Sequence, residues 1–169
     1  MTPLSSVVPS GPSSTFEVEL ADLADTERFA AHLARQTRSG DVIGLEGPLG
    51  AGKTTFARGF IVALLGPVEV PSPTFTLLQT YERNDLSLWH FDLYRLSKPE
   101  DVVELGLEEA LGRAIVLIEW PERLGAFAPV DRLVIRFEPG PAHNFRHARL
   151  TAHGPRGHAL LAALRAKTP

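Results

Sequence analysis

The chain has 169 residues, of which 44% are hydrophobic and 22% charged, and its net charge is −3. This balance is typical of one soluble globular domain, and it disfavours a wholesale nucleic-acid binder, which is usually strongly basic. The absence of cysteine excludes a disulfide scaffold, a thiolate zinc site and a cysteine nucleophile. The sequence has neither an 18-residue apolar run nor a basic and apolar leader, so we expect a cytoplasmic protein without a membrane span.

Strands and helices alternate in the first half of the chain. Residues 1–13 are rich in Ser, Pro and Gly, and we expect a disordered tail there, followed by one domain over residues 14–169. The predicted elements are a strand at 15–20, a helix capped by Asp25 or Thr26 and ending near Arg38, a strand at 41–46, a glycine-rich turn at 47–52, and a helix at 53–65 that Gly66 and Pro67 stop.

The second half adds a hairpin and further buried strands. Two prolines exclude a helix at 70–74. The predicted elements are an antiparallel hairpin at 75–81 and 86–91, a helix at 99–112, an apolar strand at 114–120, strands at 133–137 and 148–152, and a terminal helix at 158–166. The pattern therefore predicts an α/β domain of the P-loop NTPase type. Its mixed, mostly parallel central sheet is flanked by helices and carries the hairpin and basic C-terminal strands.

The segment from residue 131 onward is basic. It holds only two acids, Asp131 and Glu138, against seven arginines and lysines and four of the six histidines. An ordinary solvated surface explains such a segment, and so does a face that binds phosphate, RNA or an acidic partner. Both interpretations stay open at this point.

A glycine-rich loop carries the strongest functional signal. Residues 47–54 read GPLGAGKT, which fits G-x-x-x-x-G-K-[ST] at every fixed position, between an apolar strand and an amphipathic helix. Glycines at 47, 50 and 52, with Ala51 between, let backbone N–H groups wrap an anion in front of the helix N-terminus. In such a loop Lys53 reaches the β- and γ-phosphates and the Thr54 hydroxyl binds Mg²⁺. A plain glycine turn that opens a helix is the structural alternative.

Two acids at strand ends are candidates for the Mg²⁺ and water side of this site. Glu119 ends the apolar run AIVLIE and Asp92 ends LSLWHFD. We assign Glu119 to the Mg²⁺ shell, through water, and Asp92 to the γ-phosphate side, where it orients the attacking water or contacts the metal. The two roles are interchangeable on this reasoning, and each acid alone would also suit a strand end at the surface.

Three further features of the sequence each allow two interpretations. The stiff, hydroxyl-bearing segment VPSPT at 70–74 suits a loop that senses the γ-phosphate, or else a rigid connector. His90 is better explained as a packed or hydrogen-bonded strand residue than as a catalyst. Trp120 suits either a core anchor or a partner contact. An N-K-x-D motif is absent from the sequence, so guanine specificity has no support.

Four segments together resemble the TsaE (YjeE) family of small bacterial ATPases. They are GPLGAGKTTFARGF, VPSPTFTL, WHFDLYRL and LIEWPERL, in the family's order and spacing, within a match from about Ala21 to Arg149. The resemblance implies an ATPase that works with TsaD-like and TsaB-like proteins to make N6-threonylcarbamoyladenosine in tRNA. By this resemblance the ATPase hydrolyses ATP to reset the complex, performs no transfer itself, and meets tRNA only through the complex.

The resemblance also implies a set of site residues. Residues 50–55, including Thr55, would hold the phosphates of ATP or ADP, with Thr54 and Glu119 on Mg²⁺ and Asp92 as the acid needed for hydrolysis. Ser72 and Thr74 would belong to a switch-like loop. Thr26 and Arg146 match the region near the N-terminal helix and late basic strand that completes the family's ATP site. Pro48 departs from the family, where an acid is common at this position.

Two other classes of function are also compatible with the glycine-rich loop. A small P-loop kinase of a metabolite or nucleoside fits the size and the loop equally well, but it should carry an arginine-bearing lid and an acceptor pocket, and the sequence shows no convincing lid. A nucleotide-gated binding module would bind without turnover. Phosphate release from labelled ATP, with and without acceptor or partners, separates these classes.

Overall fold

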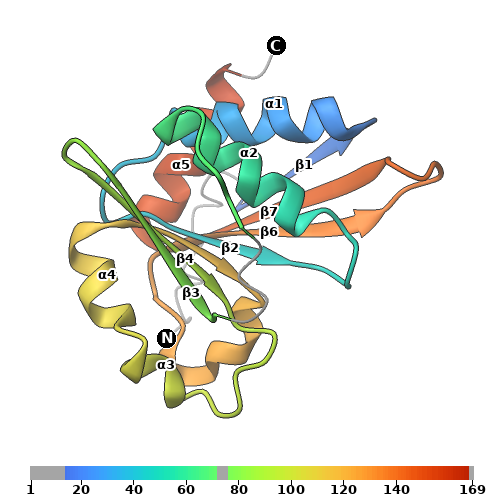
Figure 1. Cartoon of the computed structure of the whole chain (residues 1–169). Coiled ribbons are helices and arrows are strands. Elements are labelled where there is room, and N and C mark those ends of the chain that lie inside the picture. The colour runs from blue at the N-terminus through green and yellow to red at the C-terminus, as the bar shows by residue number, and fades with distance from the viewer. Residues whose placement is uncertain (1–13, 72–75, 168–169) are drawn as a thin grey trace, which may run out of the picture.

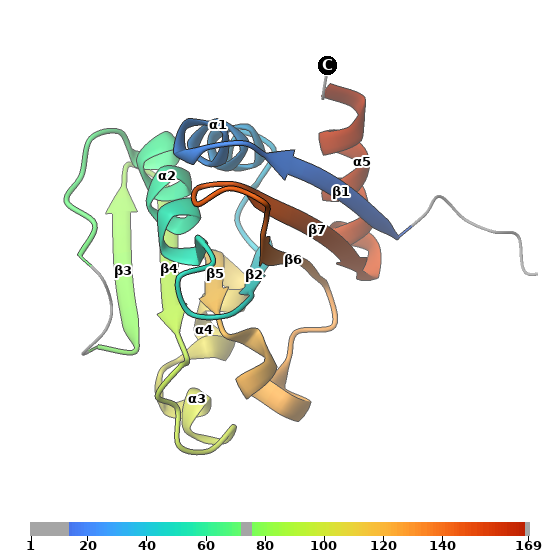
Figure 2. The same cartoon turned by 90° about the vertical axis from the view of Figure 1, so that its right-hand side faces the viewer.

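A seven-stranded sheet organises the part of the chain that the computed structural model describes, residues 14–71 and 76–167. Its strand order is β1-β7-β6-β2-β5-β4-β3, and Figure 2 shows β3 and β1 at opposite edges of the twisted sheet. The strands are β1 Thr15–Leu20, β2 Val42–Glu46, β3 Leu78–Arg83, β4 Leu86–Asp92, β5 Ile115–Glu119, β6 Arg132–Pro139 and β7 Arg146–His153. The expected disordered tail at 1–13 lies outside the described residues.

The centre of the sheet is parallel and its edges are antiparallel. The neighbours β6, β2, β5 and β4 run in the same direction, whereas β7 pairs antiparallel with both β6 and β1, and β3 pairs antiparallel with β4. This arrangement confirms the predicted α/β domain with a mixed sheet and an antiparallel hairpin. The parallel part is the buried centre, as expected of strands covered on both faces.

Helices cover both faces of the sheet (Figure 1). Helices α1 Leu23–Ala34, α2 Lys53–Leu65 and α5 Gly154–Lys167 pack on one face, over side chains such as Leu88 and Leu117. Helices α3 Asp101–Glu104 and α4 Leu107–Arg113, with the 3₁₀ segment Pro121–Phe127, cover the other face over Trp89 and Val116. Successive residues of β4 and β5 therefore enter different cores. None of the described helices is long and apolar enough to cross a membrane.

Most predicted elements are confirmed, and three helix predictions are wrong in detail, those of α1, of the helix at 99–112 and of the start of α5. Helix α1 begins at Leu23 because the Asp22 side chain accepts a hydrogen bond from the Asp25 N–H at 2.8 Å. Asp25 and Thr26 therefore lie in the first turn instead of capping it. The helix ends at Ala34 rather than near Arg38.

The single helix predicted at 99–112 is two short helices. Gly106 separates α3 from α4 with φ at +82°, a conformation that interrupts helical hydrogen bonding and that glycine adopts without strain. The 3₁₀ segment was not predicted. It starts after Trp120, which has φ at +60°, and Pro121 occupies its first position.

A buried ion pair anchors α5 to the start of β2. Asp41 is 2% exposed, and both of its carboxylate oxygens accept hydrogen bonds from the Arg156 guanidinium, at 2.9 and 2.8 Å. The Asp131 carboxylate accepts the N–H groups of Arg156 and Gly157, so the helix begins at Gly154, earlier than predicted. This bidentate geometry compensates for the removal of the Asp41 charge from water.

Replacing Arg156 should expose the cost of that burial. Arg156→Met leaves the Asp41 carboxylate buried, and within residues 14–71 and 76–167 only the Arg38 N–H remains as its partner. We expect the free energy of unfolding to fall by about 2–3 kcal/mol, near the lower end for a broken buried pair, because the guanidinium is partly exposed. Urea denaturation measures the change. Arg58→Met, at an exposed position of α2, is the matched control, and an equal loss in both variants would contradict the assignment.

Candidate functional site

The glycine-rich loop joins the end of β2 to the start of α2. Gly47, Gly50 and Gly52 have φ at +136°, +76° and +106°, where L side chains are strained. A Cβ on Gly47 would lie 2.5 Å from the Phe137 carbonyl oxygen, so this position has no room for a side chain. The loop therefore folds tightly in front of the N-terminus of a long helix, which is a built site for an anion.

Lys53 lies folded back onto this loop. Its Nζ donates hydrogen bonds to the carbonyl oxygens of Gly47, at 2.5 Å, and Pro48, at 2.8 Å, and stands 4.3 Å from the centre of the Trp120 ring. The residue is 5% exposed. Burial lowers the pKa of the Lys53 ammonium, and the negative charge of Glu119 opposes that shift. The two carbonyls and the aromatic face stabilise the ammonium beside the place where phosphates would bind.

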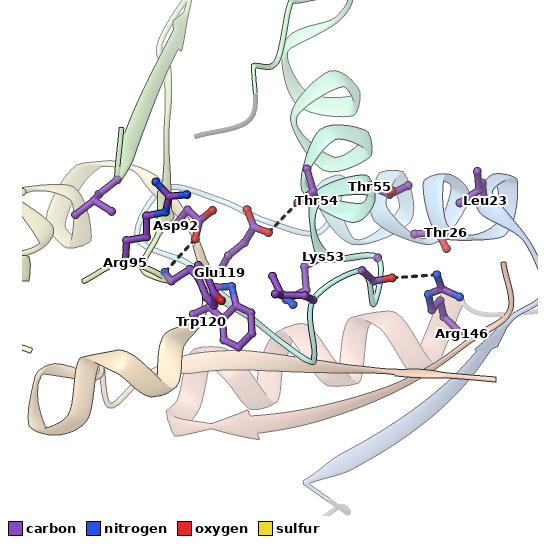
Figure 3. A pocket seen from close by; sticks show the side chains of 15 residues that line it. Leu23, Thr26, Lys53, Thr54, Thr55, Asp92, Arg95, Glu119, Trp120 and Arg146 are labelled. Atoms are coloured by element: carbon purple, nitrogen blue, oxygen red, sulfur yellow. Dashed lines mark hydrogen bonds between the residues drawn. The ribbon is translucent and has the colours of Figure 1, made fainter. Parts of the chain in front are cut away.

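The two predicted acids lie next to each other at the carboxyl edge of the sheet. Asp92 and Glu119 are direct partners in the parallel register of β4 and β5. The Thr54 hydroxyl donates to Glu119 Oε1 at 3.2 Å, and Figure 3 shows this bond with Asp92 beside it. Glu119 is 2% exposed. Burial raises the pKa of the Asp92 carboxyl, and the Glu119 charge raises it further, while the N–H of Tyr94 opposes the shift.

One cavity of about 450 Å³ unites most of the predicted residues. Those that line it are Thr26, Gly50, Gly52, Lys53, Thr54, Thr55, Asp92, Glu119 and Arg146. Gly47 and Ala51 belong to the loop without lining this cavity, and the Ala51 side chain is buried. The switch-like segment with Ser72 and Thr74 lies outside the described residues.

Arg146 and Thr26 flank the far side of the loop (Figure 3). The Arg146 guanidinium donates to the carbonyl oxygens of Ala51, at 2.7 Å, and Gly50, at 3.1 Å. Arg146 therefore braces the loop from β7 as well as lining the cavity. The Thr26 hydroxyl donates to the Asp22 carbonyl oxygen at 3.3 Å, and the residue is 2% exposed.

Six lining residues were not assigned to this site from the sequence: Leu23, Leu49, Leu77, Tyr94, Arg95 and Trp120. Tyr94, Arg95 and Trp120 follow closely after the predicted acids at strand ends, and residues at such positions converge in open α/β sheets. That signal could have identified them. The three leucines carry no comparable signal, because an apolar residue at a cavity mouth resembles any other surface leucine.

The oxygen ligands of this cavity suit Mg²⁺. Thr54, Glu119 and Asp92 offer hydroxyl and carboxylate oxygens, which are the ligands of a hard cation. Among the described residues no group of three or more His, Cys, Asp or Glu forms a complete metal cage. Mg²⁺ is usually held by one or two protein oxygens together with phosphate oxygens and water, so an incomplete protein set fits this ion.

The basic segment is largely engaged within the chain. Arg136 pairs with Glu46 at 3.1 Å and Arg149 with Glu17 at 2.9 Å. Arg146 and Arg156 are committed to the loop and to Asp41, as described above. These contacts favour the interpretation of the segment as an ordinary charged surface.

Comparisons with known proteins point to one family. The family model described as "Threonylcarbamoyl adenosine biosynthesis protein TsaE" matches residues 20–147. The tRNA threonylcarbamoyladenosine biosynthesis protein TsaE of Rickettsia felis is 46% identical over 58% of this chain. The matched part spans 58% of that relative's own length. The Bacillus subtilis protein of the same name is 40% identical over 66% of this chain and 70% of its own.

A solved structure extends the similarity to the fold. The crystal structure of YdiB from Bacillus subtilis has a TM-score of 0.78 and 32% sequence identity, and the match covers 93% of this chain and 98% of that one. The resemblance carried by the four sequence segments is thereby confirmed, and the chain belongs to the TsaE family.

Proposed function

We propose that this protein is a Mg²⁺-dependent ATPase that supports the formation of N6-threonylcarbamoyladenosine in tRNA. One observation carries the ATPase part: Lys53, Thr54, Asp92 and Glu119 meet in one cavity at the glycine-rich loop. Family membership carries the role in tRNA modification. In this proposal the protein acts in the cytoplasm.

The loop and Lys53 would bind the phosphates. Backbone N–H groups of the loop and the N-terminus of α2 favour an anion at the cavity floor. Lys53 would exchange the carbonyl oxygens of Gly47 and Pro48 for phosphate oxygens, a short movement that keeps its charge compensated. Arg146 would keep the loop in shape from the opposite side.

Thr54 and Glu119 would hold Mg²⁺, which when bound neutralises charge on the phosphates. Their oxygens already lie 3.2 Å apart, with Glu119 fixed by burial. Asp92, beside Glu119, would orient the attacking water. A carboxylate whose pKa is raised is a better proton acceptor than an ordinary one, so the environment of Asp92 suits this role.

The partners in this proposal are TsaD-like and TsaB-like proteins, with tRNA reached through the complex. Apolar side chains at the cavity mouth support a partner there: Leu49 is 69% exposed, Leu23 48% and Tyr94 40%. A partner that covers them would remove apolar surface from water and exclude water from the nucleotide. Hydrolysis would then reset the complex between turnovers.

Lys53→Ala should abolish productive ATP binding or turnover. The substitution removes the one charge of the loop that reaches the β- and γ-phosphates, and no other lysine lines the cavity. A fluorescent ATP analogue and phosphate release measure the two effects. Lys98→Ala, at an exposed position away from the cavity, is the control. Unchanged phosphate release by Lys53→Ala in the full complex would remove the loop from the mechanism.

Glu119→Gln should affect the binding of nucleotide, whereas Asp92→Asn should affect its hydrolysis. Loss of the Glu119 charge should weaken the binding of nucleotide in Mg²⁺ while leaving binding in EDTA nearly unchanged. Asp92→Asn should spare binding and depress hydrolysis by about 10²-fold or more, because only water activation is lost. Titrating Mg²⁺ against a bound analogue separates the two variants. Loss of Mg²⁺ affinity in Asp92→Asn but not in Glu119→Gln would reverse the assignment.

Phosphate release should be slow for the protein alone and rise steeply with its partners. Arg95 lines the cavity, and we expect the partners to direct a positive charge such as this one at the γ-phosphate. A charge supplied there is worth about 10³-fold in the rate of hydrolysis. The assay measures phosphate release from γ-labelled ATP by the protein alone and by the protein with TsaD-like and TsaB-like proteins. A third sample contains the same complex with the Lys53→Ala variant in place of the wild type. Fast turnover alone that partners do not change would contradict the proposal. Transfer of label to a small acceptor would indicate a kinase, and binding without turnover would indicate a module.

A further inference from the structure

A buried histidine contacts the carboxylate that we place on Mg²⁺. His90 lies within β4 and is 1% exposed. Its Nε2 lies 2.8 Å from Glu119 Oε2, while the other Glu119 oxygen accepts the hydrogen bond from Thr54. The Glu119 carboxylate is therefore held at both oxygens, from two different elements.

The register of the sheet creates this contact. Asp92 is the direct partner of Glu119, and His90 is the partner of Leu117, two residues earlier along both strands. Alternate residues of a strand point to the same face, so His90 and Asp92 lie on the face of Glu119. That face also packs against α2, which carries Thr54. His90 thus contacts Glu119 diagonally across the two strands, from a position two residues further from their carboxyl ends.

The surroundings of the ring determine which nitrogen carries the proton. A carboxylate only accepts hydrogen bonds, so Nε2 must donate to Glu119. The other nitrogen, Nδ1, is buried and has no hydrogen-bond partner among the residues that the structure describes. A hydrogen on Nε2 therefore satisfies the contact with Glu119.

We propose that His90 is a positioning residue for Glu119. Resting on the proposed function, this inference assigns to His90 the task of keeping Oε1 directed at Thr54 and the metal position. A ligand without such support would sample other rotamers and bind the ion less tightly. Removal of an outer partner of this kind costs about 10- to 100-fold in metal affinity. The contact with Glu119 thereby explains a buried polar ring between the apolar side chains of Trp89 and Phe91.

Two substitutions test the hydrogen bond separately from the ring. His90→Leu removes the donor, whereas His90→Gln offers an amide N–H near the position of Nε2. We expect His90→Leu to weaken Mg²⁺-dependent binding of a fluorescent ADP analogue by about tenfold or more, with binding in EDTA changed by less than about twofold. His90→Gln should recover most of the loss. His32→Leu, on α1 away from the cavity, is the control for loss of a histidine with a buried ring nitrogen that has no partner in the described part of the chain.

The result can also go against the proposal. If His90→Leu keeps the Mg²⁺ dependence of the wild type, or if binding in Mg²⁺ and in EDTA falls by the same factor, His90 does not position the metal ligand. The second pattern would assign it a purely structural role. Failure of His90→Gln to recover more than His90→Leu would equally overturn the donor role.

A second measurement does not depend on nucleotide. Nitrogen-15 NMR of the nucleotide-free protein should show His90 as the Nε2-protonated tautomer, with a slowly exchanging proton that moves upfield in Glu119→Gln. The Nδ1-protonated form would overturn the positioning role. If the NMR result holds while the wild-type protein binds no nucleotide in Mg²⁺ or EDTA, the proposed ATPase function fails and the Glu119 contact stands.

Discussion

The parallel pairing of β2, β5 and β4 places chemically distinct segments at one edge of the sheet, and the site depends on it. The loop that begins at Gly47 leaves β2, Glu119 ends β5 and Asp92 ends β4. Parallel strands bring these ends together although they are far apart in the sequence. A shift of one residue between β4 and β5 would turn His90 and Asp92 to the opposite face, away from Thr54. The antiparallel edge strands extend the sheet, and β7 adds Arg146 against the loop.

The charged side chains at the carboxyl ends of these strands have partners within the protein when no ligand is bound. Lys53 uses two loop carbonyls and the Trp120 face, and Glu119 uses Thr54 and His90. A buried charge without such partners would be costly, so the protein can keep both groups in place only by satisfying them internally. In the proposed function, binding of a nucleotide would then be an exchange of partners with little rearrangement. This preorganisation is the physical basis for assigning the cavity to phosphates and Mg²⁺.

Local sequence signals predicted the elements that local chemistry determines. The loop at 47–52 and helix α2 follow from glycines, a helix start and the Gly66 stop, and β1 follows from its alternation. The acids were identified because each ends a predicted strand downstream of the glycine-rich loop, and the strand before Glu119 is apolar throughout. Two helix boundaries could not be decided locally, because the cap at Asp22 competed with two other good caps nearby and Gly106 broke a helix whose periodicity continued across it. Distances between elements were not accessible from the sequence either. The His90 contact depends on strand register, which no local pattern contains.

The central claim is that Thr54 and Glu119 hold the metal of a nucleotide bound at the glycine-rich loop. Crystals grown with a non-hydrolysable ATP analogue and Mn²⁺ in place of Mg²⁺ test this most directly, because Mn²⁺ is located by its anomalous scattering. The account predicts an anomalous peak beside Thr54 Oγ1 on the side of Glu119, with the β- and γ-phosphates inside the loop and Lys53 released from Gly47 and Pro48. Nucleotide bound outside the loop, or a metal peak away from both Thr54 and Glu119, would contradict it.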